Sequence, residues 1–332
     1  MKLLRILSGI LIAAIVFLPA GCSKEEPAAK LAEIKIVGTI GPMVIPLARM
    51  AETNALDSVA EKTSLTLWAN PAQLQATIAG SQGDFVSLPV NSAATFYNKG
   101  IQLKLLDCSI WNILYLLSTD PDITSMEDLR GKRVVVPFQG TSPDVVFRFN
   151  LEQSGVDPET DVDIFYAPDP VQATQLFLSG QDDYVLLSEP SATTVMKKAA
   201  ASGKTVYRNL NMNEVWKEVT GGASQIAQAG TIALGAVSEN TAVMDAFLEE
   251  YEKAVQWMLD NPEEAGEVGA RALVEQGFTA DVLAESMAYI DWRFTPADEA
   301  YDDIAGFLTA LMEASPDFTG GKMPDNAFYY GK

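Results

Sequence analysis

The sequence predicts an α/β protein of two similar lobes, joined by a hinge that closes a cleft between them. Three observations lead to this prediction. The chain has 332 residues, more than one small core needs. Short apolar runs alternate with helical stretches, which is typical of mostly parallel sheets covered by helices. The string QGDFVSLPVNSAAT at residues 82–95 returns as QDDYVLLSEPSATT at residues 181–194, at an offset of 99 and without a gap.

The first residues predict a secreted, lipid-anchored protein. Two basic residues precede the apolar run 6–18, whose 13 residues are fewer than the roughly 20 of a membrane-spanning helix. Small residues then precede Cys22, as in a bacterial lipoprotein signal, where the cysteine is lipidated after cleavage. We expect residues 1–21 to be the lipoprotein signal peptide and residues 22–32 the lipid anchor and tether. The alternative is an ordinary secretory signal with an incidental cysteine.

The elements expected next follow the alternation of short runs. Runs rich in β-branched residues indicate strands, while proline or asparagine near the start and glycine near the end bound the helices. We expect strands at 34–39, 65–69 and 84–88, helices at 45–54, 71–81 and 91–100, and extended runs at 101–109 and 111–119.

The same pattern restarts after a helical turn at 125–132. After residue 238 the alternation of short strands and helices ends, and long helices are expected. We expect strands at 133–137, 163–167 and 183–187, helices at 141–155, 169–180 and 190–203, extended runs at 204–210 and 231–237, and long helices at 241–261, 262–277 and 301–315.

The repeat explains the proposed lobes. A Pro-x-Gln triplet also recurs at the offset of 99, so residues 71–95 and 170–194 are each a helix, a strand and a helix. Chance similarity of two ordinary units is the alternative. We expect lobe 1 to comprise residues 33–118 plus 230–332, and lobe 2 to comprise residues 119–229. Two crossings of the chain between lobes would make a hinge, and a hinge between two lobes makes a closable cleft.

Composition excludes several classes of function. The net charge of −21 argues against nucleic acid, because phosphate contacts need clustered lysine and arginine. Histidine is absent, which removes the commonest general base and the commonest zinc ligand. We expect Cys108 to be a small buried residue, since no Cys–His pair is possible. The acidic runs 261–267 and 296–303 lack calcium-loop spacing, so we expect no metal and no cofactor.

The predicted binding site lies in the loops that follow the parallel strands. Ligands of such sheets bind beyond the carboxyl ends of strands, where helix N-termini present free N–H groups. Neutral hydroxyls and amides at these positions suit an oxyanion such as sulfonate, nitrate or carboxylate. Helix capping without any ligand is the alternative. The selected residues are Thr39, Gly41, Pro42, Met43, Ser87, Leu88, Asn91 and Ser92 in lobe 1, and Gln139, Gly140, Thr141, Ser142, Ser188 and Glu189 in lobe 2.

Trp111, Asn112 and Glu189 are further candidates, and two of these side chains have two interpretations each. Trp111 and Asn112 interrupt an apolar run, so the indole is expected either to stack on a ligand or to belong to the core. Glu189 is the one acid in the predicted site, and it would either hold a ligand amine or brace a loop.

Several blocks resemble one family. DLRGKRVVVPFQGTSPD, LSGQDDYVLLSEPSATT and the tail GGKMPDNAFYY are similar to the nitrate/sulfonate/taurine-type substrate-binding proteins of ABC transporters. The resemblance implies a type II periplasmic binding fold and a monomer anchored through Cys22 on the periplasmic side of the cell envelope. It implies a small-molecule solute and delivery to an ABC permease with a cytoplasmic ATPase, with no catalysis and no nucleic acid.

The solute itself stays open. Relatives commonly carry a G(Y/F)F…GL stretch after the first strand, whereas this chain has ARMAETNALDSV. The first hypothesis is a small organic anion. A heteroaromatic solute, such as a thiamine-pyrimidine or flavin precursor, is the second, and an enzyme built on the same fold is the third.

Overall fold

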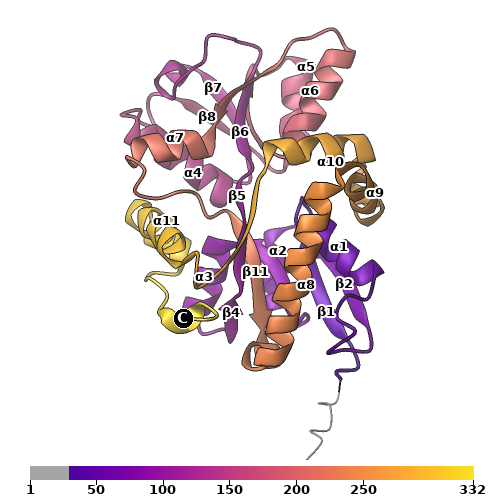
Figure 1. Ribbon diagram of the computed structural model, residues 1–332. Coiled ribbons are helices and arrows are strands. Elements are labelled where there is room, and N and C mark those ends of the chain that lie inside the picture. Colours follow the sequence, from indigo (N-terminus) through magenta and orange to yellow (C-terminus); the bar gives the residue numbers. More distant parts are fainter. Residues whose placement is uncertain (1–29) are drawn as a thin grey trace, which may run out of the picture.

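The computed structural model describes residues 30–332 and contains two β-sheets, one above the other in Figure 1. The predicted signal peptide and the lipidation site Cys22 lie outside the described residues. We call each sheet with its helices a lobe. The predicted two-lobed α/β architecture is confirmed. Within residues 30–332, no helix combines the length and the apolar character needed to cross a bilayer.

The first sheet has seven strands in the order β12-β5-β11-β3-β1-β2, with β4 paired to β11. Its centre is parallel, since β1 pairs in parallel with both β2 and β3, and β11 joins β3 antiparallel. The strands are β1 (Ile34–Thr39), β2 (Thr63–Trp68), β3 (Phe85–Pro89), β4 (Leu103–Leu105), β5 (Asp107–Asn112), β11 (Ala229–Leu234) and β12 (Asp291–Pro296).

The second sheet has five strands in the order β10-β6-β9-β7-β8 and the same parallel centre. Here β7 pairs in parallel with β8 and β9, and β6 joins β9 antiparallel. The strands are β6 (Leu114–Ser118), β7 (Arg133–Pro137), β8 (Asp163–Ala167), β9 (Tyr184–Ser188) and β10 (Tyr207–Asn211).

The helices follow the same plan in both lobes. The first lobe has α1 (Val44–Glu52), α2 (Pro71–Ala79) and α3 (Val90–Asn98), and the second has α4 (Ser142–Gln153), α5 (Pro170–Ser179), α6 (Ser191–Ala201) and α7 (Met212–Val219). The C-terminal part adds α8 (Thr241–Asp260), α9 (Pro262–Ala272), α10 (Ala280–Ser286) and α11 (Tyr301–Ala314), with the short 3-10 helices η2 (Gly235–Glu239) and η4 (Met287–Tyr289) among others.

The structural repeat is longer than the sequence repeat suggests. Each lobe contains the succession β-α-β-α-β-α, from β1 to α3 and from β7 to α6. Its best-matched point is the start of the second helix. There Asn70 accepts a hydrogen bond from the Gln73 N–H at 3.0 Å, and Asp169 accepts one from the Gln172 N–H at 2.8 Å. The recurring Pro-x-Gln triplet is therefore the first turn of two equivalently capped helices.

The chain leaves the first sheet earlier than the sequence suggests. Residues 101–119 were expected as two extended runs within lobe 1, but β5 ends at Asn112 and β6 pairs with β9 of the second sheet. The crossing therefore lies at Ile113, not at residue 118. The apolar run gave no sign of this because both strands are completely buried.

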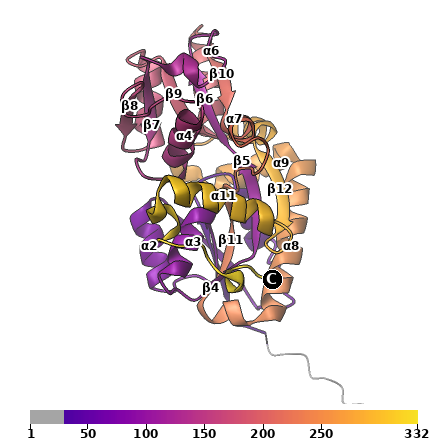
Figure 2. The same cartoon turned by 90° about the vertical axis from the view of Figure 1, so that its left-hand side faces the viewer.

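The C-terminal part contacts the second lobe on two sides (Figures 1 and 2). On one side α11 packs against α4, and Phe307 of α11 lies 5.4 Å from the Trp216 ring of α7. On the other side α10 packs against α6, where Lys197 pairs with Asp281 at 2.8 Å and with Glu285 at 2.9 Å. Cys108 of β5 is fully buried, as expected.

Candidate functional site

A cavity of about 380 Å³ is lined by both lobes at the carboxyl ends of their strands. The helices α1 to α5 each contribute a cap or first-turn residue to its wall, and the loop before α6 completes it. The first N–H groups of a helix have no partner within the helix and carry its positive dipole end. The cavity is therefore surrounded by partial positive charges from the backbone.

Most predicted site residues line this cavity. From the first lobe these are Thr39, Gly41, Pro42, Met43, Leu88, Asn91 and Ser92, and from the second lobe Gly140, Thr141, Ser142, Ser188 and Glu189.

Ser87 and Gln139, by contrast, are not among the lining residues. Ser87 is fully buried, and its Oγ accepts a hydrogen bond from the Thr39 N–H at 2.9 Å. Gln139 is exposed on the loop between β7 and α4. Ser87 therefore supports the end of β1 instead of contacting the cavity, and Gln139 is exposed to solvent.

Trp111 and Asn112 also lie outside the cavity. Successive side chains of a strand point to opposite faces, so Trp111 points away from the cavity that Ile110 of β5 lines. Trp111 is fully buried and donates its indole N–H to the Arg293 carbonyl at 2.9 Å. The Asn112 amide donates to the Tyr115 hydroxyl at 3.3 Å. The core interpretation of Trp111 thus fits the structure, and the stacking interpretation does not.

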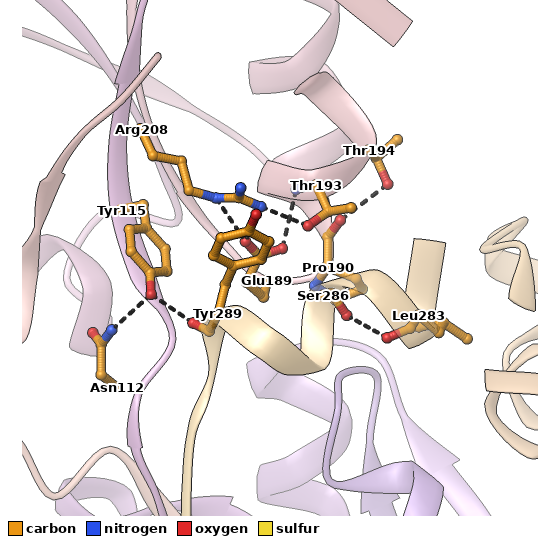
Figure 3. A network of polar contacts seen from close by, with 10 residues as sticks. All are labelled: Asn112, Tyr115, Glu189, Pro190, Thr193, Thr194, Arg208, Leu283, Ser286 and Tyr289. Atoms are coloured by element: carbon orange, nitrogen blue, oxygen red, sulfur yellow. Dashed lines mark hydrogen bonds and ion pairs between the residues drawn. The ribbon is translucent and has the colours of Figure 1, made fainter. Parts of the chain in front are cut away.

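Glu189 braces its loop, and both of its carboxylate oxygens already accept hydrogen bonds from the protein. One carboxylate oxygen accepts from Arg208 at 2.6 and 3.1 Å, and the other accepts from the Thr193 N–H at 3.0 Å (Figure 3). Burial raises the pKa of Glu189, and the Arg208 charge opposes this rise. The hydrogen bonds of the carboxylate therefore go to the start of α6 and to Arg208 of β10.

The backbone of Gly140 is likewise engaged. Its N–H donates to the Asp144 carboxylate at 2.7 Å, and its φ of 75° lies in the left-handed region. The Gly140 N–H is therefore bound to the first turn of α4 and does not point a free donor at a ligand. A side chain at residue 140 would strain the loop whether or not a ligand is bound.

Several lining residues were not among the predicted site residues, and three of them are informative. Trp68 ends β2, Phe138 follows β7, and Gln228 precedes β11. Trp68 could have been found, because the rule of strand carboxyl ends applies to β2 as well as to β1 and β3. Gln228 could not, because its position depends on a return of the chain from the second lobe. Its side-chain amide donates to Ser142 Oγ at 3.0 Å and so joins the two lobes at the cavity wall.

The cavity combines an apolar wall with neutral polar groups. Glu189 is the sole charged residue among the described lining residues, and Arg208 balances it. Asn91 is 8% exposed, and its Oδ1 has no hydrogen-bond partner within residues 30–332. A buried polar atom without a partner costs about 1–3 kcal/mol, so Asn91 is retained against its effect on stability.

No family model matches the sequence, and no curated protein sequence matches it. Solved structures do match. An ABC transporter from Parabacteroides distasonis is 26% identical, with 91% of this chain and 99% of that chain covered and a TM-score of 0.75. The periplasmic aliphatic sulphonate binding protein SsuA from Escherichia coli is 17% identical, with coverage of 90% and 92% and a TM-score of 0.70. The alkanesulfonate-binding protein SsuA from Xanthomonas axonopodis pv. citri, bound to MOPS, is 16% identical, with coverage of 90% and 96% and a TM-score of 0.64.

These neighbours define the fold. The two lobes and their sheets are those of the periplasmic binding proteins, which confirms the predicted fold class. In this fold, the candidate site is the cavity between the lobes.

Proposed function

We propose that this protein is the solute-binding component of an ABC importer and that it holds a small organic anion in the cavity between its lobes. The observation that carries the proposal is the single cavity wall shared by both lobes and surrounded by helix N-termini. The similarity to an ABC transporter protein and to two sulfonate-binding proteins supports it.

The chemistry of the wall favours an anion over a cation. Helix N-termini and neutral donors stabilise negative charge without a counter-ion. The charge of the one lining carboxylate is already balanced by Arg208, so it attracts an ammonium group only weakly. A volume of about 380 Å³ falls in the range of small-molecule sites, which suits an organic sulfonate or a taurine-like molecule better than nitrate.

Binding and closure would act together. The Gln228–Ser142 hydrogen bond joins the lobes at the cavity, and a solute touching both lobes would add to this contact. A ligand shifts the closed and open populations only by its difference in affinity for them. We therefore assign transport, which needs closure but no chemical step. Delivery to a permease with its ATPase, anchoring through Cys22 and a monomer on the periplasmic side of the cell envelope belong to this proposal.

An uncharged heteroaromatic solute is the second candidate. The aromatic side chains of Trp68 and Phe138 at the cavity wall favour it. The two candidates differ in the charge that they require of the solute, and this difference can be measured.

Thermal unfolding with a panel of sulfonates, taurine, nitrate, pyrimidines and flavins tests the proposal. A ligand at 100 times its dissociation constant adds about 2.7 kcal/mol of stability. Organic sulfonates should raise the melting temperature, while uncharged pyrimidines should leave it unchanged. The reverse pattern would favour the second candidate.

A blocking variant shows where binding occurs. Gly41 lines the cavity, and a Cβ there would meet only Thr39 Cγ2 at 3.8 Å. Gly41→Phe should therefore fold, fill the cavity and abolish the shift. Ala200→Phe, at an exposed position near the end of α6, is the matched control and should keep it.

A further inference from the structure

Two aromatic side chains line the cavity from opposite lobes, Trp68 from β2 and Phe138 from the loop after β7. The indole N–H of Trp68 donates at 2.9 Å to the Ser87 carbonyl of β3, which lies on the far side of β1 from β2. The polar edge of this indole is thereby bound to the backbone. What Trp68 offers the cavity is its apolar ring surface.

Phe138 has an unfavourable backbone conformation. Its φ of 58° lies in the left-handed region, which favours glycine and asparagine and costs a bulky residue on the order of 1 kcal/mol. The loop holds it there, because the Phe138 N–H donates to the Ala167 carbonyl at 3.0 Å and the Phe138 carbonyl accepts from Thr141 Oγ1 at 2.7 Å. A residue retained under strain at a cavity wall suggests a function for its side chain.

The internal repeat supplies a comparison within the same chain. The Ile40 N–H donates to the Trp68 carbonyl at 3.3 Å, just as the Phe138 N–H donates to that of Ala167. Ile40 is thus the counterpart of Phe138, and Ala167 is the counterpart of Trp68. Each lobe builds the same strand ends with an aliphatic residue where the other has a ring. The scaffold therefore needs neither ring, and their presence calls for another explanation.

We propose that Trp68 and Phe138 form a ring-binding subsite, and that the solute is an organic anion whose charged group is attached to a planar aromatic or heteroaromatic ring. This inference rests on the proposed function and narrows its class of solute. The ring packs against the two aromatic side chains, and the charged group lies at the helix N-termini. Contacts between aromatic rings are stronger than other apolar contacts of the same area. The loss of either ring should therefore weaken binding roughly tenfold.

Titration calorimetry with ligands of equal charge tests the subsite. Benzenesulfonate and cyclohexanesulfonate have rings of similar size, but only the first is planar, while ethanesulfonate has no ring. We expect benzenesulfonate to bind about tenfold more tightly than cyclohexanesulfonate. Equal affinities for these two would overturn the inference and leave the proposed function standing.

Three variants test whether the two rings cause the preference for benzenesulfonate. Phe138→Asn suits the left-handed backbone, so it should fold with unchanged or higher melting temperature. Trp68→Leu removes the other ring, and Trp68→Phe is its conservative partner. Phe138→Asn and Trp68→Leu should each reduce benzenesulfonate affinity about tenfold and leave ethanesulfonate affinity within twofold, while Trp68→Phe restores most of the preference. Loss of affinity for all three ligands alike would contradict a ring-specific role.

The same titrations distinguish a failure of the proposed function from a failure of the ring-binding subsite. If no sulfonate binds, the proposed function fails, and the inference fails with it. If benzamide, an uncharged ring, binds as tightly as benzenesulfonate, the anionic part of the proposed function is wrong and the ring subsite stands.

Discussion

The Arg208 guanidinium lies over the Tyr289 ring, with its central carbon 3.4 Å from the ring centroid. Arg208 belongs to β10 of the second lobe, and Tyr289 ends η4 just before β12 of the first (Figure 3). The Tyr115 hydroxyl donates to the Tyr289 carbonyl at 2.6 Å. Burial and the nearby Glu189 carboxylate raise the pKa of Tyr115 to about 12, so this hydroxyl stays protonated. Arg208 thus connects a lobe–lobe contact with Glu189 at the cavity.

Replacing Tyr289 should weaken ligand binding without unfolding the protein. A cation over an aromatic ring contributes about 0.5–2 kcal/mol, and here that energy favours the lobe arrangement of the closed cavity. Tyr289→Ala should therefore lower affinity a few-fold in titration calorimetry. Tyr207 of β10 is a matched control, because the two tyrosines are almost equally exposed, 38% for Tyr207 and 36% for Tyr289. Equal effects of the two alanine substitutions would contradict the coupling.

Removing Arg208 should destabilise the protein and change its response to pH. Arg208→Gln leaves the Glu189 carboxylate buried without a cation, a change that costs about 3–5 kcal/mol in comparable pairs. Burial then raises the pKa of Glu189 above its unfolded value, so the folded state binds the proton more tightly. The variant should gain stability as the pH falls through that raised pKa.

Denaturant unfolding between pH 5 and pH 8 measures this effect. The double variant Arg208→Gln/Glu189→Gln should recover part of the lost stability at pH 8 and lose the added pH dependence. If the stability of Arg208→Gln changed between pH 5 and pH 8 no more than that of the original protein, the Glu189 carboxylate would not be confined as described.

Asp107 should make stability fall as the pH rises. It is fully buried and accepts hydrogen bonds from Ser109 and Thr231, and burial raises its pKa to about 6. Between the unfolded value of 3.8 and about 6, the folded state holds a proton that the unfolded state releases. The protonated Asp107 therefore contributes fully to the free energy of unfolding below pH 3.8, and this contribution is lost above pH 6. The difference is roughly 3 kcal/mol.

Asp107→Asn isolates this contribution, since an amide can hydrogen-bond to both hydroxyls. In urea unfolding, the variant should match the original protein near pH 4 and exceed its stability at pH 7.5. A difference between the two that stays constant with pH would be inconsistent with this assignment.

Asn91 should serve binding at the expense of stability. Because its Oδ1 has no partner within residues 30–332, Asn91→Leu should leave the melting temperature unchanged or raise it, while ligand affinity falls. Asn150 is an instructive comparison. Its Oδ1 also lacks a partner in that range, but its Nδ2 donates to the Met212 carbonyl at 2.9 Å, and it does not line the cavity. Asn150→Leu should therefore destabilise the protein without changing affinity, the opposite of the Asn91 result.

Local patterns in the sequence were enough to predict the alternation of elements and a large part of the cavity wall. The Pro-x-Gln repeat identified equivalent helix starts because capping depends on residues close in sequence. What depends on distant contacts could not be predicted. The sequence left open whether Glu189 binds a ligand amine or braces a loop. Its partner Arg208 lies on β10, and this contact could not be predicted from the residues around Glu189.

Other features could not be predicted because the residues concerned are buried on every side. The crossing at Ile113 falls in a buried stretch, and Asn112 just before it did not indicate a change of sheet. Trp111 and Ile110 are neighbours in that stretch, and only their strand orientation decides which of them lines the cavity. The backbone conformation of Phe138, which sets it apart from other apolar residues, has no signature in the sequence around it.

The most direct test of the account is a crystal structure of the protein with benzenesulfonate. We expect one sulfonate in the cavity, with its oxygens within hydrogen-bond distance of N–H groups at the starts of α3 and α4 and its ring against Trp68 and Phe138. A ligand bound elsewhere on the surface, or touching one lobe alone while the other stands apart, would contradict the account.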